Sequence, residues 1–140
     1  MKPEEVQYIE YRLSRAKESL DESRLLLDRD YLNAVVNRLY YACFYAVSAL
    51  LCFDQVDAKK HQGVLAAFDV RWVKPGRLPK EMGRFIHRLF DRRQLGDYGK
   101  RTEFRKTQVE AWFRQAQAFI AAVGEQVAQQ FKAGDGPLDE

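Results

Sequence analysis

Apolar positions recur along the chain at intervals of three and four residues, and no segment alternates in the way a half-buried strand would. The first apolar stripe comprises Val6, Ile9, Leu13, Ala16, Leu20 and Leu27. Pro3 and the two glutamates after it suit a helix start, because proline lacks only a donor that is unused there and carboxylates favour the positive end of the helix dipole. The pattern predicts a first helix over about 3–28, followed by a short turn.

The next segment, about 31–53, is apolar or aromatic on nearly every side. A helix of that composition belongs at the centre of a bundle. It also carries Arg38, which shares one helical face with Tyr41 and Tyr45 because of their spacing. A buried arginine requires a partner, such as a helix end or a carboxylate like that of Asp97. We therefore expect a central helix with a polar seam on one side.

Three more helices are expected from the same periodicity. Asp57 is a candidate N-cap for a third helix over about 58–73, and Pro79 starts the fourth. The fourth is expected to loosen near Gly96, and Thr102 is a candidate cap for the fifth.

Short links between long helices imply antiparallel neighbours. The predicted fold class is all-α, an antiparallel four- to five-helix up-and-down bundle. It forms one domain over 1–131, with a disordered tail over 132–140. The last two helices keep wide apolar faces, so we expect a homodimer.

Composition points to a soluble globular protein, with 46% hydrophobic and 31% charged residues. No stretch approaches 18 uncharged apolar residues and the N-terminus does not resemble a signal peptide, so we expect no membrane association. Cys43 and Cys52 fall nine residues apart on one predicted helix, too far for a disulfide. Unpaired thiols fit a reducing, cytoplasmic location.

Positive charge is concentrated in one part of the chain. Residues 71–106 hold 12 lysines and arginines against four acidic residues, whereas the flanking segments are mildly acidic. Such a basic segment could meet a polyanion such as RNA, could meet an acidic protein, or could be a solvated face without function.

Several chemistries lack their residue patterns. Neither His61 nor His87 has a glutamate three residues before it, as inward-facing di-iron motifs require, and the cysteines form no C-x-x-C. No catalytic triad signature and no glycine-rich phosphate loop are present. We therefore predict no metal and no cofactor, and we expect both histidines to be surface residues or satisfied interface residues.

Metal-independent RNA cleavage requires a base for the 2′-hydroxyl proton and a cation for the charged transition state. Arg93 could supply the cation, with Asp97 and Tyr98 four and five residues further on. Tyrosine, with an ordinary pKa of about 10, is a poor base at neutral pH. Equally, Arg93 and Asp97 could pair on one helix face, and Arg38 could be purely structural.

Two segments carry a family resemblance: Asn37-Arg38-x-Tyr40-Tyr41-Ala42-x-Phe44 on the central helix, and Arg93-x-x-x-Asp97-Tyr98-Gly99 later in the chain. Together they resemble the HEPN domain family, the higher eukaryote and prokaryote nucleotide-binding domain. Lys60-His61 lies between them in the expected order, and the resemblance covers about residues 4–130.

The resemblance implies a dimerising helical bundle with its polar motifs near a shared cleft. It also implies a partner, a minimal nucleotidyltransferase, in a toxin–antitoxin pair. Catalytic members are metal-independent ribonucleases with an Arg-x4–6-His motif. Here the corresponding positions after Arg93 and Arg38 hold Tyr98 and Tyr45, and Lys100 stands where toxin members carry a modifiable tyrosine.

Three hypotheses remain open. The first is a HEPN-type binding module, half of a toxin–antitoxin-like pair, with a basic cleft for nucleotide or RNA. Its candidate binding residues are Arg38, Tyr41, Tyr45, Arg92, Arg93, Tyr98, Lys100 and Arg101. The second is an endoribonuclease toxin that uses Arg93, Asp97 and Tyr98. The third is a structural assembly domain whose polar seam sets the register of its helices.

Overall fold

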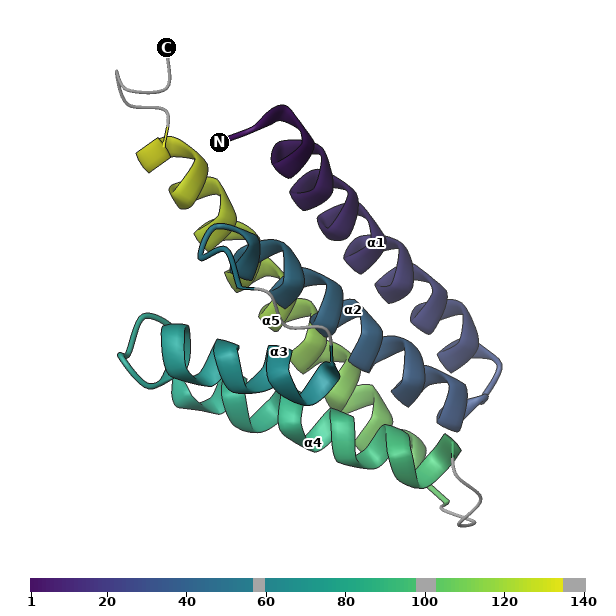
Figure 1. Cartoon of the computed structure of the whole chain (residues 1–140). Helices are drawn as coiled ribbons and strands as arrows, with labels where there is room; N and C mark the ends of the chain where they lie inside the picture. Colours follow the sequence, from purple (N-terminus) through teal and green to yellow (C-terminus); the bar gives the residue numbers. More distant parts are fainter. Residues whose placement is uncertain (57–59, 98–102, 135–140) are drawn as a thin grey trace.

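A computed structural model describes residues 1–56, 60–97 and 103–134, and it is helical throughout these ranges apart from short links (Figure 1). The described elements are α1 (Pro3–Asp28), α2 (Leu32–Cys52), α3 (His61–Phe68), the π-helix η1 (Asp69–Val73), α4 (Lys80–Asp97) and α5 (Lys106–Gly134). The prediction of an all-α helical bundle is confirmed.

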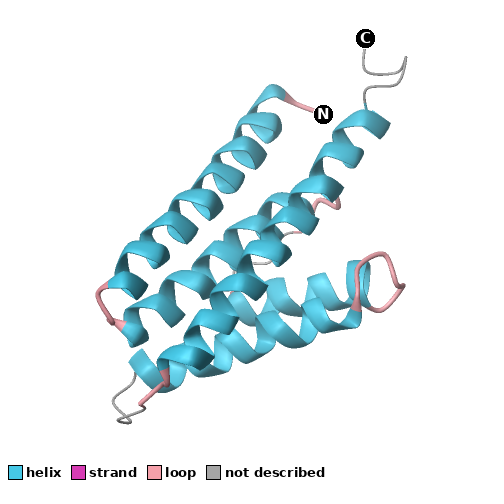
Figure 2. Cartoon of the chain, turned by 180° about the vertical axis from the view of Figure 1, so that it is seen from behind, coloured by secondary structure: helices cyan, strands magenta, loops and turns pink. Residues whose placement is uncertain are grey.

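Helix α2 lies at the centre of the molecule. It packs against α1, α3, α4 and α5. Figure 1 shows α1 on one side of α2 and the pair formed by α3 and α4 on the other, and the view from behind in Figure 2 shows the same arrangement. Because α2 contacts four neighbours, eleven of its residues are fully buried and it carries much of the core.

The apolar character of α2 invites comparison with a membrane span. By length and composition alone, Leu32–Cys52 could cross a bilayer. This differs from the sequence analysis, which expected no apolar stretch of that length. In the bundle, 61% of that window is buried, as in the core helix of a soluble protein. Cys43 is buried within α2 and Cys52 is partly exposed, and both are unbridged. A cytoplasmic location stays a prediction.

The helix boundaries follow the local signals closely at the start of the chain. α1 spans the predicted residues, and its first turn is closed by a capping box in which the backbone N–H of Lys2 donates to the Glu5 carboxylate at 3.0 Å. α4 begins at Lys80, directly after the predicted Pro79.

Other boundaries differ from the expectation. The predicted third helix changes to a π-helix after Phe68, which places the buried Trp72 in a wider final turn. Its expected cap Asp57 lies outside the described residues, and α3 begins at His61. α5 begins at Lys106, four residues after Thr102, which also lies outside the described part.

α5 continues to Gly134, so it runs past the predicted domain end at residue 131. Residues 135–140 of the predicted tail lie outside the described residues, and the disorder of the tail stays a prediction.

Candidate functional site

One edge of the central helix is not covered by its neighbours. Within α2, the partly exposed positions from Asn37 onward recur at intervals of one, three and four residues and so follow one stripe along the helix. We call these positions the α2 stripe: Asn37, Arg38, Tyr41, Phe44, Tyr45, Ser48 and Cys52. It combines cationic, aromatic and polar groups on a helix that is otherwise core.

Arg93 of α4 meets this stripe from the side opposite α1. The carbon of its guanidinium lies 5.1 Å from the Tyr40 ring centroid and 5.5 Å from that of Tyr41. Its NH1 group also approaches the Tyr41 hydroxyl at 3.4 Å. Arg38 lies 5.2 Å from the same Tyr41 ring. Two arginines from different helices therefore converge on one tyrosine of the central helix, on the side where its polar seam was expected.

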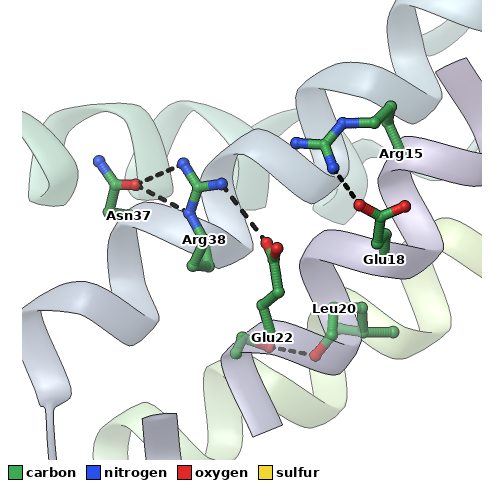
Figure 3. Close-up of polar contacts among 7 residues, drawn as sticks. Arg15, Glu18, Leu20, Glu22, Asn37 and Arg38 are labelled. Atoms are coloured by element: carbon green, nitrogen blue, oxygen red, sulfur yellow. Dashed lines mark hydrogen bonds and ion pairs between the residues drawn. The ribbon is translucent and has the colours of Figure 1, made fainter. Parts of the chain in front are cut away.

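The partners of Arg38 differ from the carboxylate suggested by the sequence. Nε and NH2 of Arg38 donate to the Asn37 side-chain oxygen at 3.1 and 2.9 Å, and NH1 lies 3.6 Å from a carboxylate oxygen of Glu22 on α1 (Figure 3). The Arg38 side chain is 27% exposed, so it is not a fully buried cation. The side chain of Asp97, the suggested partner, lies outside the described part of the structure.

Tyr45 occupies the part of the α2 stripe that faces α1. Its ring lies 5.4 Å from the guanidinium carbon of Arg12 and 5.4 Å from that of Arg15. Its centroid is 5.9 Å from that of Tyr41. A hydrogen bond with Tyr45 is the main reason that the pKa of Arg15 is raised, so this cation stays charged. Tyr45 thus links the Arg93 end of the stripe to two arginines that sequence reasoning did not select.

His61, which was expected to have no role beyond a surface or interface position, also joins the site. Its Nδ1 lies 2.7 Å from the Tyr40 hydroxyl, and its ring stacks on Phe44 with centroids 4.3 Å apart. Burial and the positive charge of Arg93 lower the pKa of His61 below its ordinary value, so the ring is neutral at neutral pH. The contact between Tyr40 and His61 joins residues that are 21 positions apart in the sequence. Sequence reasoning therefore noted the Lys60-His61 pair but not this contact.

The protonation of this pair follows from burial. Tyr40 is fully buried, and burial raises the pKa of its hydroxyl, which therefore keeps its proton. A buried hydroxyl needs an acceptor, and His61 Nδ1 lies within hydrogen-bond reach of it. We assign the tautomer in which Nδ1 accepts this hydrogen bond and Nε2 carries the ring proton.

Several candidate residues cannot be placed in this cluster. Arg92 is exposed on α4. Tyr98, Lys100 and Arg101 lie outside the described residues. Over the ranges that the structure describes, no group of three or more His, Cys, Asp or Glu residues is arranged to hold a metal ion.

Comparison with known proteins agrees with this helical architecture. The HEPN domain family matches residues 9–126. A UPF0332 protein of Thermotoga maritima is 47% identical over 120 residues, covering 86% of this chain and 91% of the relative. A Methanocaldococcus jannaschii protein named "Putative toxin" is 31% identical over 112 residues, covering 80% of this chain and 76% of its own. A second protein with that description from the same organism is 32% identical over 83 residues, covering 59% of this chain and 62% of the relative. This chain belongs to the HEPN domain family.

Proposed function

We propose that this chain is a toxin-like HEPN module that binds single-stranded RNA or a nucleotide at the Arg93 end of the α2 stripe. The observation that carries the proposal is the convergence of Arg93 and Arg38 on Tyr41, with His61 next to them. The toxin descriptions of two relatives support the toxin-like part of the proposal.

The chemistry of the cluster suits a phosphate and an adjacent base. Guanidinium groups bind phosphate through paired N–H donors, and both arginines are held in place by aromatic rings. In the assigned tautomer, Nε2–H of His61 is a further donor for a phosphate oxygen. The partly exposed Tyr41 offers a ring on which an unpaired base can stack.

The test is titration of a labelled single-stranded RNA with the purified protein at low and high salt. Arg93→Gln is expected to weaken binding about tenfold and to reduce its salt dependence, because each phosphate contact to a single strand adds about 0.7 to the slope of log affinity against log salt. Arg114→Gln, an exposed arginine of α5, removes the same charge elsewhere and serves as the control. Equal losses in the two variants would contradict a site at Arg93.

A second candidate function is metal-independent RNA cleavage, and one observation favours it. The fold places His61 close to Arg93 although no histidine follows that arginine in the sequence. In cleavage, the 2′-hydroxyl would lose its proton to a base while its oxygen bonds to the neighbouring phosphorus, giving a cyclic phosphate. The bond from phosphorus to the 5′-oxygen would break, and that oxygen would take a proton from water. His61 Nε2 would act as that base only in the tautomer whose Nδ1–H donates to Tyr40.

A gel of the same RNA samples separates the two functions. Cleavage that persists with a chelator and is lost in both Arg93→Gln and His61→Phe would establish the ribonuclease. Binding without cleavage is the outcome expected from the assigned tautomer, since a protonated Nε2 donates a hydrogen bond and accepts no proton.

We further propose that the chain forms a homodimer and pairs with a minimal nucleotidyltransferase. This proposal rests on the resemblance to the HEPN domain family, whose members pair with such an enzyme, and the chain's membership of that family is its basis. Light scattering coupled to size-exclusion chromatography would measure the mass of the chain alone and after mixing with a purified minimal nucleotidyltransferase. A monomeric mass that is unchanged by mixing would contradict both proposals.

A further inference from the structure

The aromatic and cationic surface does not end at Arg93. From Tyr41 it continues to Tyr45, and from there to Arg12 and Arg15 on α1, each 5.4 Å from the Tyr45 centroid. Arg12 also lies 5.1 Å from the ring of Tyr8, which is 40% exposed. Tyrosines and arginines therefore lie next to one another along the α1–α2 face, in the order Arg93, Tyr41, Tyr45, Arg12 with Arg15, and Tyr8.

A polar cavity lies at the far end of this surface. It has a volume of about 440 Å³, within the range of roughly 300–1,000 Å³ that ligand pockets occupy. Tyr8 belongs both to its wall and to the contact with Arg12. Lys2, Glu5, Ser48 and Gln55 also line it and provide hydrogen-bond donors and acceptors of the kind that read the edge of a base.

The carboxylates near these arginines do not block a phosphate. Glu18 pairs with Arg15 at 2.5 Å (Figure 3). The Glu18 side chain is nevertheless 57% exposed. Exposed ion pairs contribute little free energy, so a phosphate can replace this partner. Nε of Arg12 is buried and has no hydrogen-bond partner among the described residues, so a phosphate contact of this arginine has to come from the terminal nitrogens of its guanidinium.

Resting on the proposed function, we infer that a single strand of RNA lies along the α1–α2 face from the Arg93 end to this cavity. Arg12 and Arg15 contact its phosphates, the rings of Tyr45 and Tyr8 contact its bases, and the cavity receives one base. Cationic groups that follow the backbone, combined with aromatic rings on which bases stack, are the arrangement by which proteins bind an unpaired strand. A duplex would not fit this mode, because its bases are stacked on one another and their faces are unavailable.

The test compares two ligands, labelled UMP and a labelled oligouridylate long enough to cross the face. The double variant Arg12→Gln/Arg15→Gln is expected to weaken oligouridylate binding about tenfold and to lower its salt slope by about 1.4, which corresponds to two phosphate contacts. UMP is too short to span the face, so its binding at the Arg93 end is expected to stay the same. Arg93→Gln is expected to weaken both ligands.

Arg24→Gln is the matched control. Arg24 lies on the same helix and also packs over an aromatic ring, 5.2 Å from the centroid of Phe113, but on the side of α1 that faces α5. If the double variant does not fold, as judged by thermal unfolding, Arg15→Gln alone replaces it, since this side chain is partly exposed.

Three results would overturn the inference. Arg12 and Arg15 could prove indifferent while Arg93→Gln weakens both ligands, which would leave the proposed function intact. Arg24→Gln could weaken the oligonucleotide as much as the double variant, which would indicate nonspecific attraction to charge. Absence of binding of either ligand to the unmodified chain would overturn the inference and the proposed function together.

Discussion

At the scale of single residues, the hydrogen bond between Tyr40 and His61 joins the start of α3 to the core of α2. The ring of His61 is stacked on Phe44 as well, so its orientation is held by two contacts from α2. A histidine in such a place has a defined donor and acceptor side. The chemistry available at Arg93 therefore depends on how α3 docks.

The lowered pKa of His61 makes stability depend on pH. Its ordinary value is 6.5, and the unfolded chain keeps that value while the folded chain has a lower one. The unfolded state binds more protons between these two values, so the free energy of unfolding falls as pH falls through this window. The contribution is complete above 6.5 and is lost as pH approaches the folded pKa.

His61→Phe should remove this dependence. At pH of about 7 the variant is expected to be less stable by about 1–3 kcal/mol, because the buried Tyr40 hydroxyl loses its acceptor. The difference in free energy of unfolding between the variant and the unmodified chain should narrow at pH of about 5.5, because His61 of the unmodified chain resists protonation in the folded state. Urea unfolding at both pH values measures the gap, and a gap that widens on acidification would contradict the lowered pKa.

Glu22 is expected to weaken RNA binding by competing for Arg38. The two side chains lie 3.6 Å apart and both are partly exposed. Glu22→Gln should therefore raise the affinity for single-stranded RNA a few-fold at low salt, with little change in stability. Glu125→Gln, an exposed acidic residue of α5, removes the same charge at a distance and should have a smaller effect in the same titration.

At the scale of elements, local signals account for much of the fold and for the shared helical face of Arg38, Tyr41 and Tyr45, but not for the contacts that His61 and α1 add to it. The periodicity and turn residues predicted α1 and the start of α4, since those signals act within a few residues. The π-helical turn after Phe68 has no comparable signature, because it depends on how Trp72 packs. The contact between His61 and Tyr40 arises only when α3 lies against α2, so no spacing in the sequence could reveal it.

The π-helix η1 packs closely against α4 at Gly83, and a substitution there can test this contact. A Cβ at Gly83 would lie 3.1 Å from Oδ1 of Asp69 and 3.2 Å from Cγ1 of Val73. His87 holds Asp69 at 2.5 Å and Val73 is β-branched, so neither neighbour moves easily. Close packing between α4 and η1 therefore requires glycine at this position.

Gly83→Ala should destabilise the protein by about 1 kcal/mol, because overpacking costs about 1–3 kcal/mol and alanine regains only about 1 kcal/mol of helix propensity. Gly124→Ala is the control, since a Cβ in that part of α5 meets nothing within 4 Å. It should stabilise by about 0.5–1 kcal/mol. Chemical denaturation measures both changes, and equal stabilisation by the two substitutions would contradict the close contact at Gly83.

At the scale of the whole molecule, α2 connects every other helix to the candidate site. The same helix buries eleven residues in the core and presents the α2 stripe, so the site and the core share one backbone. Domains of this size usually unfold in one cooperative step. A ligand held on the α2 stripe should therefore stabilise all five α-helices, and not only α1 and α4, whose arginines contact the stripe.

Binding of RNA should consequently raise the unfolding temperature of the whole bundle. When free RNA exceeds Kd about a hundredfold, a ligand specific to the folded state adds about 2.7 kcal/mol to the free energy of unfolding. For a domain of this length that amounts to several degrees in Tm. Helical circular dichroism and the fluorescence of Trp72 and Trp112 should report the same shift, because both tryptophans are buried in the core. At the same RNA concentration Arg93→Gln should show a smaller shift, and an unchanged Tm despite measurable RNA binding would mean that the strand binds the folded and unfolded chains alike.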